Sequence, residues 1–196
     1  MTRDVNTTSV QDRAHLSFES AARERFAFLN DLGFSEVESL PTLIRYQNDG
    51  VEVDVYHGRQ SYEIGAGVSG FGTRYAMVEI IRTTDSATAK GYRNAVATTP
   101  EGVATGLEEL ASLMQHYGIA ALRGDPEFFS ALENQRKSWS EEYALDVLAD
   151  QLRPQADEAF RRGDYSKAAE LYERIRSRLS PAEIKKLTLA EDRSRS

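Results

Sequence analysis

Carboxylates and tyrosines gather between residues 42 and 92, and they are the groups in this chain best suited to chemistry. Glu52, Asp54, Glu63 and Glu79 lie on or beside segments with the pattern of β-strands. If neighbouring strands bring them together, they form an acidic sheet face suited to a basic partner or to general acid–base work. The ordinary alternative is the solvated side of a half-buried sheet.

Tyrosines accompany these carboxylates, and Glu79 stands out among the acids. It lies within the apolar run Ala76–Ile81, so we expect it at a sheet edge or paired with Arg45 or Arg74. Aromatic residues with charged neighbours are typical of protein interfaces, and equally of strands, whose pleat they fit. The candidate binding residues are Asp54, Tyr56, Tyr62, Glu63, Glu79 and Tyr92.

The residue types needed for catalysis or metal binding are scarce. There is no cysteine, and the three histidines lie far apart in the sequence, without the spacing of a metal site. His57 could meet Asp54 and Glu63 in space, but no motif favours that arrangement. The glycines of Gly65–Gly70 lead to no helix, so a bulge and a turn explain them better than a phosphate loop. We expect no catalytic residue, no metal and no cofactor.

Residues 17–99 predict a helix followed by an antiparallel meander. Ser17 is a candidate cap for a helix over Phe18–Asp31, which Gly33 would end in a left-handed conformation. Asn48-Asp49-Gly50 predicts a tight hairpin turn, since alternating residues follow it in Val51–His57. The four expected strands are Thr42–Gln47, Val51–His57, Ser61–Val68 and Arg74–Arg82.

The remainder of the chain predicts a loop and then helices. Thr83–Thr99 has no clear period and is expected to be a long loop or lid. Helices are expected from Pro100, from Pro126 and from near Ser140, with Pro154 kinking or interrupting the third. The fold class is therefore α+β. The expected regions are a disordered tail (1–16), a helix plus four-stranded antiparallel meander (17–99), a helical region (100–192) packed on the sheet or forming a second small domain, and a disordered end (193–196).

Residues near the C-terminus carry a pattern of small and aromatic residues at helical spacing. They are Ala156, Ala159, Phe160, Gly163-Asp164-Tyr165, Ala168, Tyr172, Ile175 and Pro181. This segment resembles one tetratricopeptide-type helical hairpin of about 35 residues. A second recognisable unit does not follow, although arrays need about three repeats for stability. The resemblance implies a helical hairpin that packs on the preceding helices, with an adaptor role as one option.

Charge and hydropathy limit the classes of partner. The net charge is −7, and residues 1–140 carry −6 of it, which argues against nucleic-acid binding and favours a basic partner. No apolar run approaches the roughly 20 residues that span a bilayer, and the first 16 residues lack the apolar core of a signal peptide. We therefore expect a cytoplasmic protein without membrane association, of an oligomeric state that the sequence leaves open.

Residues 18–82 loosely resemble uncharacterised bacterial proteins of the toxin-neutralising (immunity) kind. The residues behind the resemblance are those of a helix plus a meander, marked by Val51–Tyr56 and Tyr62-Glu63-Ile64. It implies a non-catalytic module that binds one protein partner, with acidic residues masking a basic active site. Two alternatives stay open: a small-molecule-binding protein or enzyme with a pocket between sheet and helices, and a tetratricopeptide-like adaptor.

Overall fold

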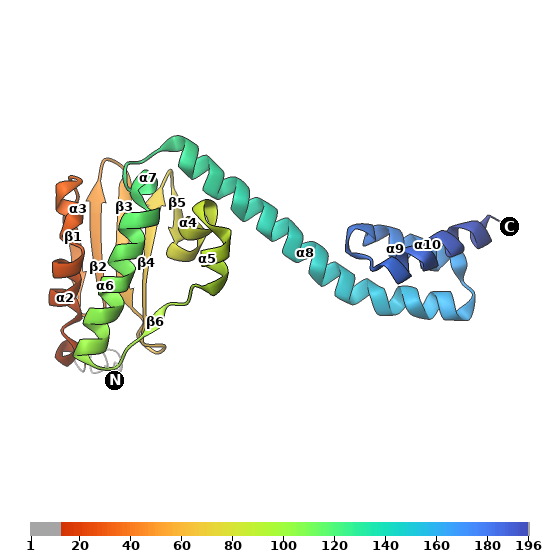
Figure 1. Cartoon of the computed structure of the whole chain (residues 1–196), viewed down its shortest axis with the longest axis horizontal. Helices are drawn as coiled ribbons and strands as arrows, with labels where there is room; N and C mark the ends of the chain where they lie inside the picture. The colour runs from red at the N-terminus through yellow and green to blue at the C-terminus, as the bar shows by residue number, and fades with distance from the viewer. Residues whose placement is uncertain (1–12, 196) are drawn as a thin grey trace, which may run out of the picture. The chain divides into compact units, whose positions relative to one another are not determined.

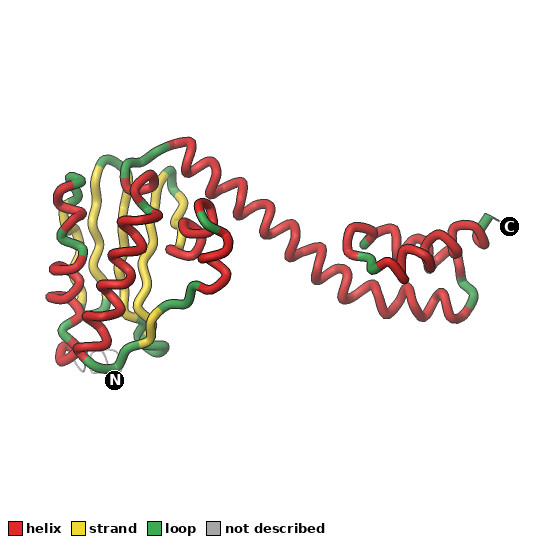
Figure 2. The backbone as a smooth tube through the Cα atoms, in the orientation of Figure 1, coloured by secondary structure: helices red, strands yellow, loops and turns green. Residues whose placement is uncertain are grey.

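The computed structural model describes residues 13–195, so most of the expected N-terminal tail lies outside the described residues. Residues at its end are ordered, because Ala14–Leu16 form a 3-10 turn, η1, in which Leu16 is buried. The contacts between Cα atoms divide the chain into two compact units, Met1–Gln135 and Arg136–Ser196. The first unit holds the sheet, and the second is helical (Figures 1 and 2).

A six-stranded antiparallel sheet forms the centre of the first unit. Its strands are β1 (Ser35–Leu40), β2 (Leu43–Asn48), β3 (Val51–His57), β4 (Glu63–Gly70), β5 (Thr73–Ala76) and β6 (Ala95–Val96). The first five lie in chain order, as a meander does, and β6 pairs with β4. The α+β fold class is therefore confirmed, although β1 and β6 add two strands to the predicted four.

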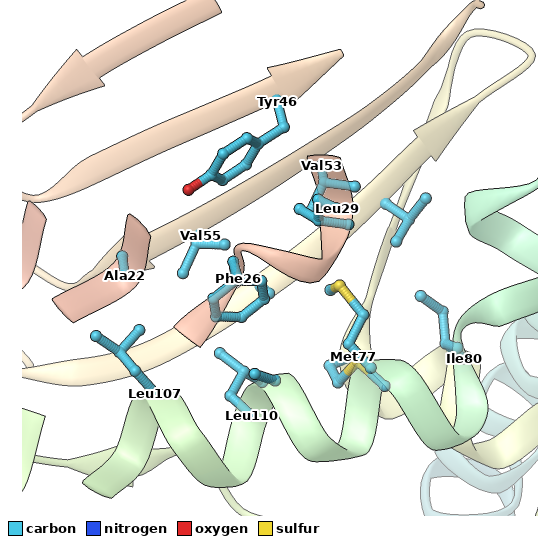
Figure 3. Packing of buried hydrophobic residues seen from close by; sticks show 14 of the residues in the cluster. Ala22, Phe26, Leu29, Tyr46, Val53, Val55, Met77, Ile80, Leu107 and Leu110 are labelled. Carbon is cyan, nitrogen blue, oxygen red and sulfur yellow. The ribbon is translucent and has the colours of Figure 1, made fainter. Parts of the chain in front are cut away.

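Helices cover one face of this sheet. The helices of the first unit are α2 (Phe18–Arg25), α3 (Phe28–Asp31), α4 (Met77–Thr84), α5 (Ser86–Gly91), α6 (Pro100–Tyr117), α7 (Ile119–Leu122) and the start of α8 (Pro126–Arg162). Figure 1 shows α2, α3 and α6 in front of the strands. Alternate strand residues such as Val53 and Val55 point to this side and are fully buried with Phe26, Leu107 and Ile80 (Figure 3).

The hairpin predicted at Asn48-Asp49-Gly50 is confirmed. Both central residues have positive φ, 41° at Asp49 and 86° at Gly50, which is the mirror-image turn that matches the twist of paired strands. β3 has the predicted bounds, and its alternation places Val53 and Val55 on the covered face, with Asp54 and Tyr56 on the other.

The strand predicted over Arg74–Arg82 is wrong after Ala76, where the chain turns into α4. The carboxylate of Glu79 accepts a hydrogen bond of 2.8 Å from the backbone N–H of Ala76, which caps the first turn of the helix. Met77, Ile80 and Ile81 are buried at helical spacing. An apolar run this short fits the two-residue period of a strand as well as the 3.6-residue period of a helix, and the acidic cap favours the helix.

Other local predictions also differ from the structure. The expected loop Thr83–Thr99 contains α5, capped by the Asp85 carboxylate, and the short strand β6. Ser17 makes no side-chain cap, and the expected first helix breaks at Phe26 into α2 and α3. Gly67 pairs regularly with both neighbouring strands, so it is not a bulge.

Strand β1 ends the sheet order and is irregular. Its pairing with β2 shifts register between Glu36 and Glu38, and Val37 at the shift is 54% exposed. A bulge of this kind bends and twists the strand that carries it. Glu36 is nevertheless held in place, because Arg23 of α2 donates to both its carboxylate oxygens at 2.8 and 2.9 Å.

The second unit is a small helical bundle. It consists of the rest of α8 with α9 (Tyr165–Arg174), the 3-10 turn η2 (Arg176–Arg178) and α10 (Pro181–Ser194). Its core residues are Ala149, Leu152, Ala156, Ala168, Leu171, Tyr172, Ile175, Leu187 and Ala190. α8 continues through Pro154, so the predicted interruption is wrong, and α10 extends to Ser194, within the expected disordered end.

The residues that resemble a tetratricopeptide hairpin lie in this bundle. Gly163, with φ of 79°, ends α8, and the Asp164 side chain caps α9. Tyr172 is fully buried and donates a hydrogen bond of 2.5 Å to Asp157.

Among the described helices, none is both long and apolar enough to cross a membrane.

Candidate functional site

The sheet face opposite the helices, which we call the open face, is organised by ion pairs. Its central pair joins Asp54 of β3 to Arg74 of β5 across the intervening strand β4. Arg74 donates through Nε and Nη2 to the two carboxylate oxygens of Asp54, at 2.7 and 2.6 Å. This bidentate hydrogen bonding raises the pKa of Arg74, and Asp54 is only 7% exposed. The pair therefore fixes both side chains on the open face.

Two glycines of β4 make room for this arrangement. A Cβ atom at Gly67 would lie 2.4 Å from the guanidinium carbon of Arg74, and one at Gly65 would lie 2.4 Å from the Tyr56 ring. The Arg74 guanidinium also lies 5.9 Å from the centroid of that ring. Because glycine has no side chain, Tyr56 and Arg74 can lie directly over the backbone of β4.

A second set of charges continues across the same face toward β1. Arg45 of β2 lies 2.5 Å from the carboxylate of Glu38 and 3.8 Å from that of Glu52. The open-face residues are Glu38, Arg45, Glu52, Asp54, Tyr56 and Arg74. In these strands every carboxylate of the set has an arginine within ion-pair distance, so acidic and basic groups alternate across the surface.

A hollow adjoins the open face at the outer edge of β4. There β6 pairs with Glu63 and Ile64, whereas β5 pairs only from Gly67 onward, so neither strand pairs with Gly65 and Ala66 on that side. The hollow has a volume of about 250 Å³. It is lined by Tyr56, Glu63, Ala66, Ala76, Met77, Val78, Tyr92, Arg93 and Asn94. Three predicted binding residues thus line one cavity: Tyr56, Glu63 and Tyr92.

Some polar groups of the hollow have hydrogen-bond partners among the described residues, and the Glu63 carboxylate does not. Tyr92 donates its hydroxyl to Oδ1 of Asn94 at 2.8 Å, and burial raises its pKa to about 12. Arg93 donates from Nη1 to the carbonyls of Tyr92 and Lys90. Within residues 13–195, the carboxylate of Glu63 has neither an ion pair nor a hydrogen bond. It therefore differs from the paired carboxylates of the open face.

The other predicted residues lie elsewhere. Glu79 caps α4, and it contributes to the electrostatic field at Arg74. Tyr62 is not among the residues that line the hollow, and its ring instead lies between Arg13 and His57. The Arg13 guanidinium is 4.0 Å from the Tyr62 ring centroid, and the His57 ring is 5.7 Å away. The structure thus brings together Tyr56, Glu63 and Tyr92, with Asp54 beside them.

His57 is buried and packs against aromatic residues. It is 1% exposed, its Nε2 lies 2.9 Å from the carbonyl oxygen of Ala97, and its ring stacks on Phe18. Burial lowers its pKa, with smaller opposing contributions from the carbonyls of Ala97 and Tyr62. The described residues contain no group of three His, Cys, Asp or Glu side chains placed to hold a metal ion.

An exposed aromatic residue stands at the tip of the β4–β5 hairpin. Phe71 has φ of 52°, an unusual conformation for a bulky residue, and it is 70% exposed. Its ring packs edge-on against Phe129 of α8, with the centroids 5.4 Å apart. A second cavity of about 250 Å³ lies beside these rings. The hairpin tip therefore presents an apolar surface beside α8, on the side of the sheet that Tyr75 faces.

Sequence reasoning did not single out Arg93 and Asn94, and it considered Arg74 only as a partner for Glu79. The pairing of Arg74 with Asp54 depends on the register of β3, β4 and β5, which hydrophobic patterns do not specify across three strands. Comparison with protein-family models, curated proteins and solved structures finds no match.

Proposed function

We propose that this chain is a protein-binding module of the immunity or inhibitor type, and that it docks its partner on the open face. The observation that carries the proposal is the ordered array of Asp54, Arg74 and Tyr56 on the sheet face opposite α2, α3 and α6. Side chains already held in place lose less conformational entropy when a partner binds, which favours recognition.

The residue types on this surface also suit a protein interface. Tyrosine and arginine are enriched among the residues that contribute most to binding, and the open face presents Tyr56, Arg45 and Arg74. Residues 1–135 contain 19 acidic and 11 basic side chains, a net charge of −8, whereas residues 136–196 carry +1. The charge of the first unit would therefore attract a basic partner at long range.

Capture of the partner from host lysate by tagged wild-type protein and by two variants tests the proposal. The double variant Tyr56→Ala/Arg74→Ala would remove the centre of the open face. The double variant Glu101→Ala/Thr105→Ala, at two exposed positions of α6, serves as the matched control. We expect one stoichiometric partner with the wild type and the control, and at least a tenfold loss with the open-face variant. Capture should also weaken as salt rises.

Two results would contradict this function. One is a partner that binds the open-face variant as strongly as the wild type, with circular dichroism showing that both are folded. The other is the absence of any stoichiometric partner at low salt. The cytoplasmic setting and the lack of catalysis belong to the same proposal; the absence of cysteine and of a nucleophile motif supports them.

A second candidate function is small-molecule binding. It is favoured by the cavity of about 250 Å³ that collects Tyr56, Glu63 and Tyr92 at a break in the strand pairing. Native mass spectrometry of the gently purified protein, compared with the denatured protein, tests for a retained ligand. A mass difference that disappears on denaturation would support this function, and identical masses under gentle conditions would count against a tightly bound metabolite.

An adaptor role for the tetratricopeptide-like hairpin is the third candidate. The capped turn at Gly163 and Asp164 supports a helical hairpin of this kind. The residues that resemble the repeat, however, build the core of the second unit. Substituting exposed residues of α9, such as Glu170 and Glu173, tests this role, since an adaptor would lose its partner while remaining folded.

A further inference from the structure

We propose that the hollow at the edge of β4 binds a small zwitterion, an α-amino acid with an apolar side chain. This inference rests on the second candidate function and names its ligand class. The structure places an acidic residue, Glu63, and a basic residue, Arg93, on the lining of the same cavity. Within the described residues these two groups form no ion pair with each other.

The charge arrangement selects a ligand that carries both signs. The carboxylate of Glu63 can accept hydrogen bonds from an ammonium group, because no described side chain or backbone group donates to it. The Arg93 guanidinium uses Nη1 for the carbonyls of Lys90 and Tyr92, which leaves Nε and Nη2 to donate to a ligand carboxylate. A simple cation or anion would satisfy one group and be repelled by the other.

Asn94 and the two tyrosines add neutral polar groups. Oδ1 of Asn94 already accepts from the Tyr92 hydroxyl, which fixes the side chain with its N–H₂ available as a donor. The Tyr56 hydroxyl lies on the same lining, with its ring held over Gly65. These groups can complete the hydrogen bonding of an ammonium and a carboxylate without adding charge.

Size and apolar lining point to an amino acid and not to a larger metabolite. The volume of about 250 Å³ is below the roughly 300–1,000 Å³ of pockets that hold drug-sized ligands. Part of the lining is apolar, contributed by Ala66, Met77 and Val78, and it can receive a small aliphatic side chain. A ligand with two charged ends and one apolar branch matches all three surfaces.

The experiment titrates the full chain with the standard L-amino acids and follows the methyl signal of Met77 by NMR, with calorimetry for affinity. For the best-binding amino acid, the N-acetyl and carboxamide derivatives are then compared. We expect saturable binding with a Kd of roughly 1 mM or tighter, and about a tenfold loss for each blocked end. No saturable binding by any free amino acid at that concentration would overturn the proposal.

Two charge variants assign the ends of the ligand. Glu63→Gln should weaken binding of the free amino acid about tenfold and leave binding of the N-acetyl derivative unchanged. Arg93→Gln should likewise weaken binding of the free amino acid about tenfold, but leave binding of the carboxamide derivative unchanged. Glu101→Gln, at an exposed position of α6 outside the hollow, is the matched control and should bind like the wild type. Equal losses for all derivatives in both charge variants would contradict the assignment of the two ends.

The same variants separate this site from the open-face interface. Neither Glu63 nor Arg93 takes part in the ion pairs of Asp54, Arg74 and Arg45. If amino acids fail to bind while the open face still captures its partner, only the present inference fails. If amino acids bind to a chain that captures no partner, the protein-binding function fails and this site stands.

Discussion

The two faces of the one sheet are stabilised in different ways. On the covered face, β3 buries Val53 and Val55 completely under the helices. On the open face, residues from the same strand are held by electrostatics and by a close fit to glycine: Asp54 pairs with Arg74, and Tyr56 lies over Gly65. A one-residue step along the strand thus separates a core that stabilises the fold from a surface available for recognition.

The comparison predicts that substitutions on the covered face affect stability and that those on the open face affect binding. The largest effect should come from Phe26→Ala, because Phe26 is fully buried, with Val55 of the sheet and Leu107 and Leu110 of α6 around it (Figure 3). We expect a loss of about 3–5 kcal/mol in the free energy of unfolding. Urea unfolding followed by tyrosine circular dichroism measures it. Gln47→Ala on the open face, an exposed position, should change stability by less than about 0.5 kcal/mol.

Two glycines in β4 provide a sharper test within one strand. A Cβ atom at Gly70 would lie 2.4 Å from the ring of Phe129, which is only 4% exposed. Gly70→Ala should therefore cost about 1–3 kcal/mol. At Gly67 the obstructing group is the end of the flexible Arg74 side chain, so Gly67→Ala should cost less than about 1 kcal/mol.

The binding assay should reverse the order of these glycine variants. Gly67→Ala displaces Arg74 from its position over β4 and should weaken partner capture, whereas folded Gly70→Ala should retain it. Thermal unfolding and capture are measured on the same preparations. Equal thermal destabilisation by both substitutions would remove the proposed distinction between the faces.

The central ion pair should contribute moderately to stability. Asp54→Asn leaves Arg74 without its carboxylate, and since the Arg74 side chain is 44% exposed, water can replace part of the interaction. We expect a loss of about 1–2 kcal/mol in chemical unfolding. Glu38→Gln, which affects a more exposed pair with Arg45, is the comparison and should cost no more than about 0.5 kcal/mol.

The smallest expected effect is the pH dependence of stability that arises from His57 on the covered face. The pKa of His57 is lowered in the folded protein, so the unfolded chain binds a proton more readily. The contribution of neutral His57 to the free energy of unfolding is therefore fully present above the unfolded pKa of about 6.5. It is lost progressively as the pH falls below that value. Unfolding free energies between pH 5 and 8 should show this slope, and His57→Gln should reduce it.

Gln115→Ala, at an exposed position on α6 without a titratable group, provides the control for this measurement. It should leave the pH dependence between 5 and 8 as in the wild type. An unchanged slope in His57→Gln would show that other groups govern the pH response.

Sequence patterns predicted the fold class and the central hairpin because these depend on local signals. Val51–His57 alternates along its length, and Asn48-Asp49-Gly50 supplies the residues that its turn requires. The switch from β5 to α4 was missed because Ala76–Ile81 is too short to distinguish a strand from a helix, and the capping role of Glu79 was not recognised.

The candidate site was predicted in part. Tyr56, Glu63 and Tyr92 were selected by residue type, and the structure places them on one cavity. Arg93 and Asn94 were missed because their segment was expected to be a loop, and the hollow arises only where β5 and β6 pair with different parts of β4. Such an arrangement depends on contacts distant in sequence, which a local pattern does not contain.

The bulge in β1 has a consequence for solubility. A regular terminal strand offers a row of unpaired backbone groups to which another chain can add, and this addition leads to aggregation. In β1 the register shift at Val37 interrupts that row. The flanking Glu36 and Glu38 are each paired with an arginine, Arg23 and Arg45, so ion pairs border the interrupted row. A second copy adding to this edge would have to fit a bent strand and disturb these ion pairs, which disfavours polymerisation through the first strand.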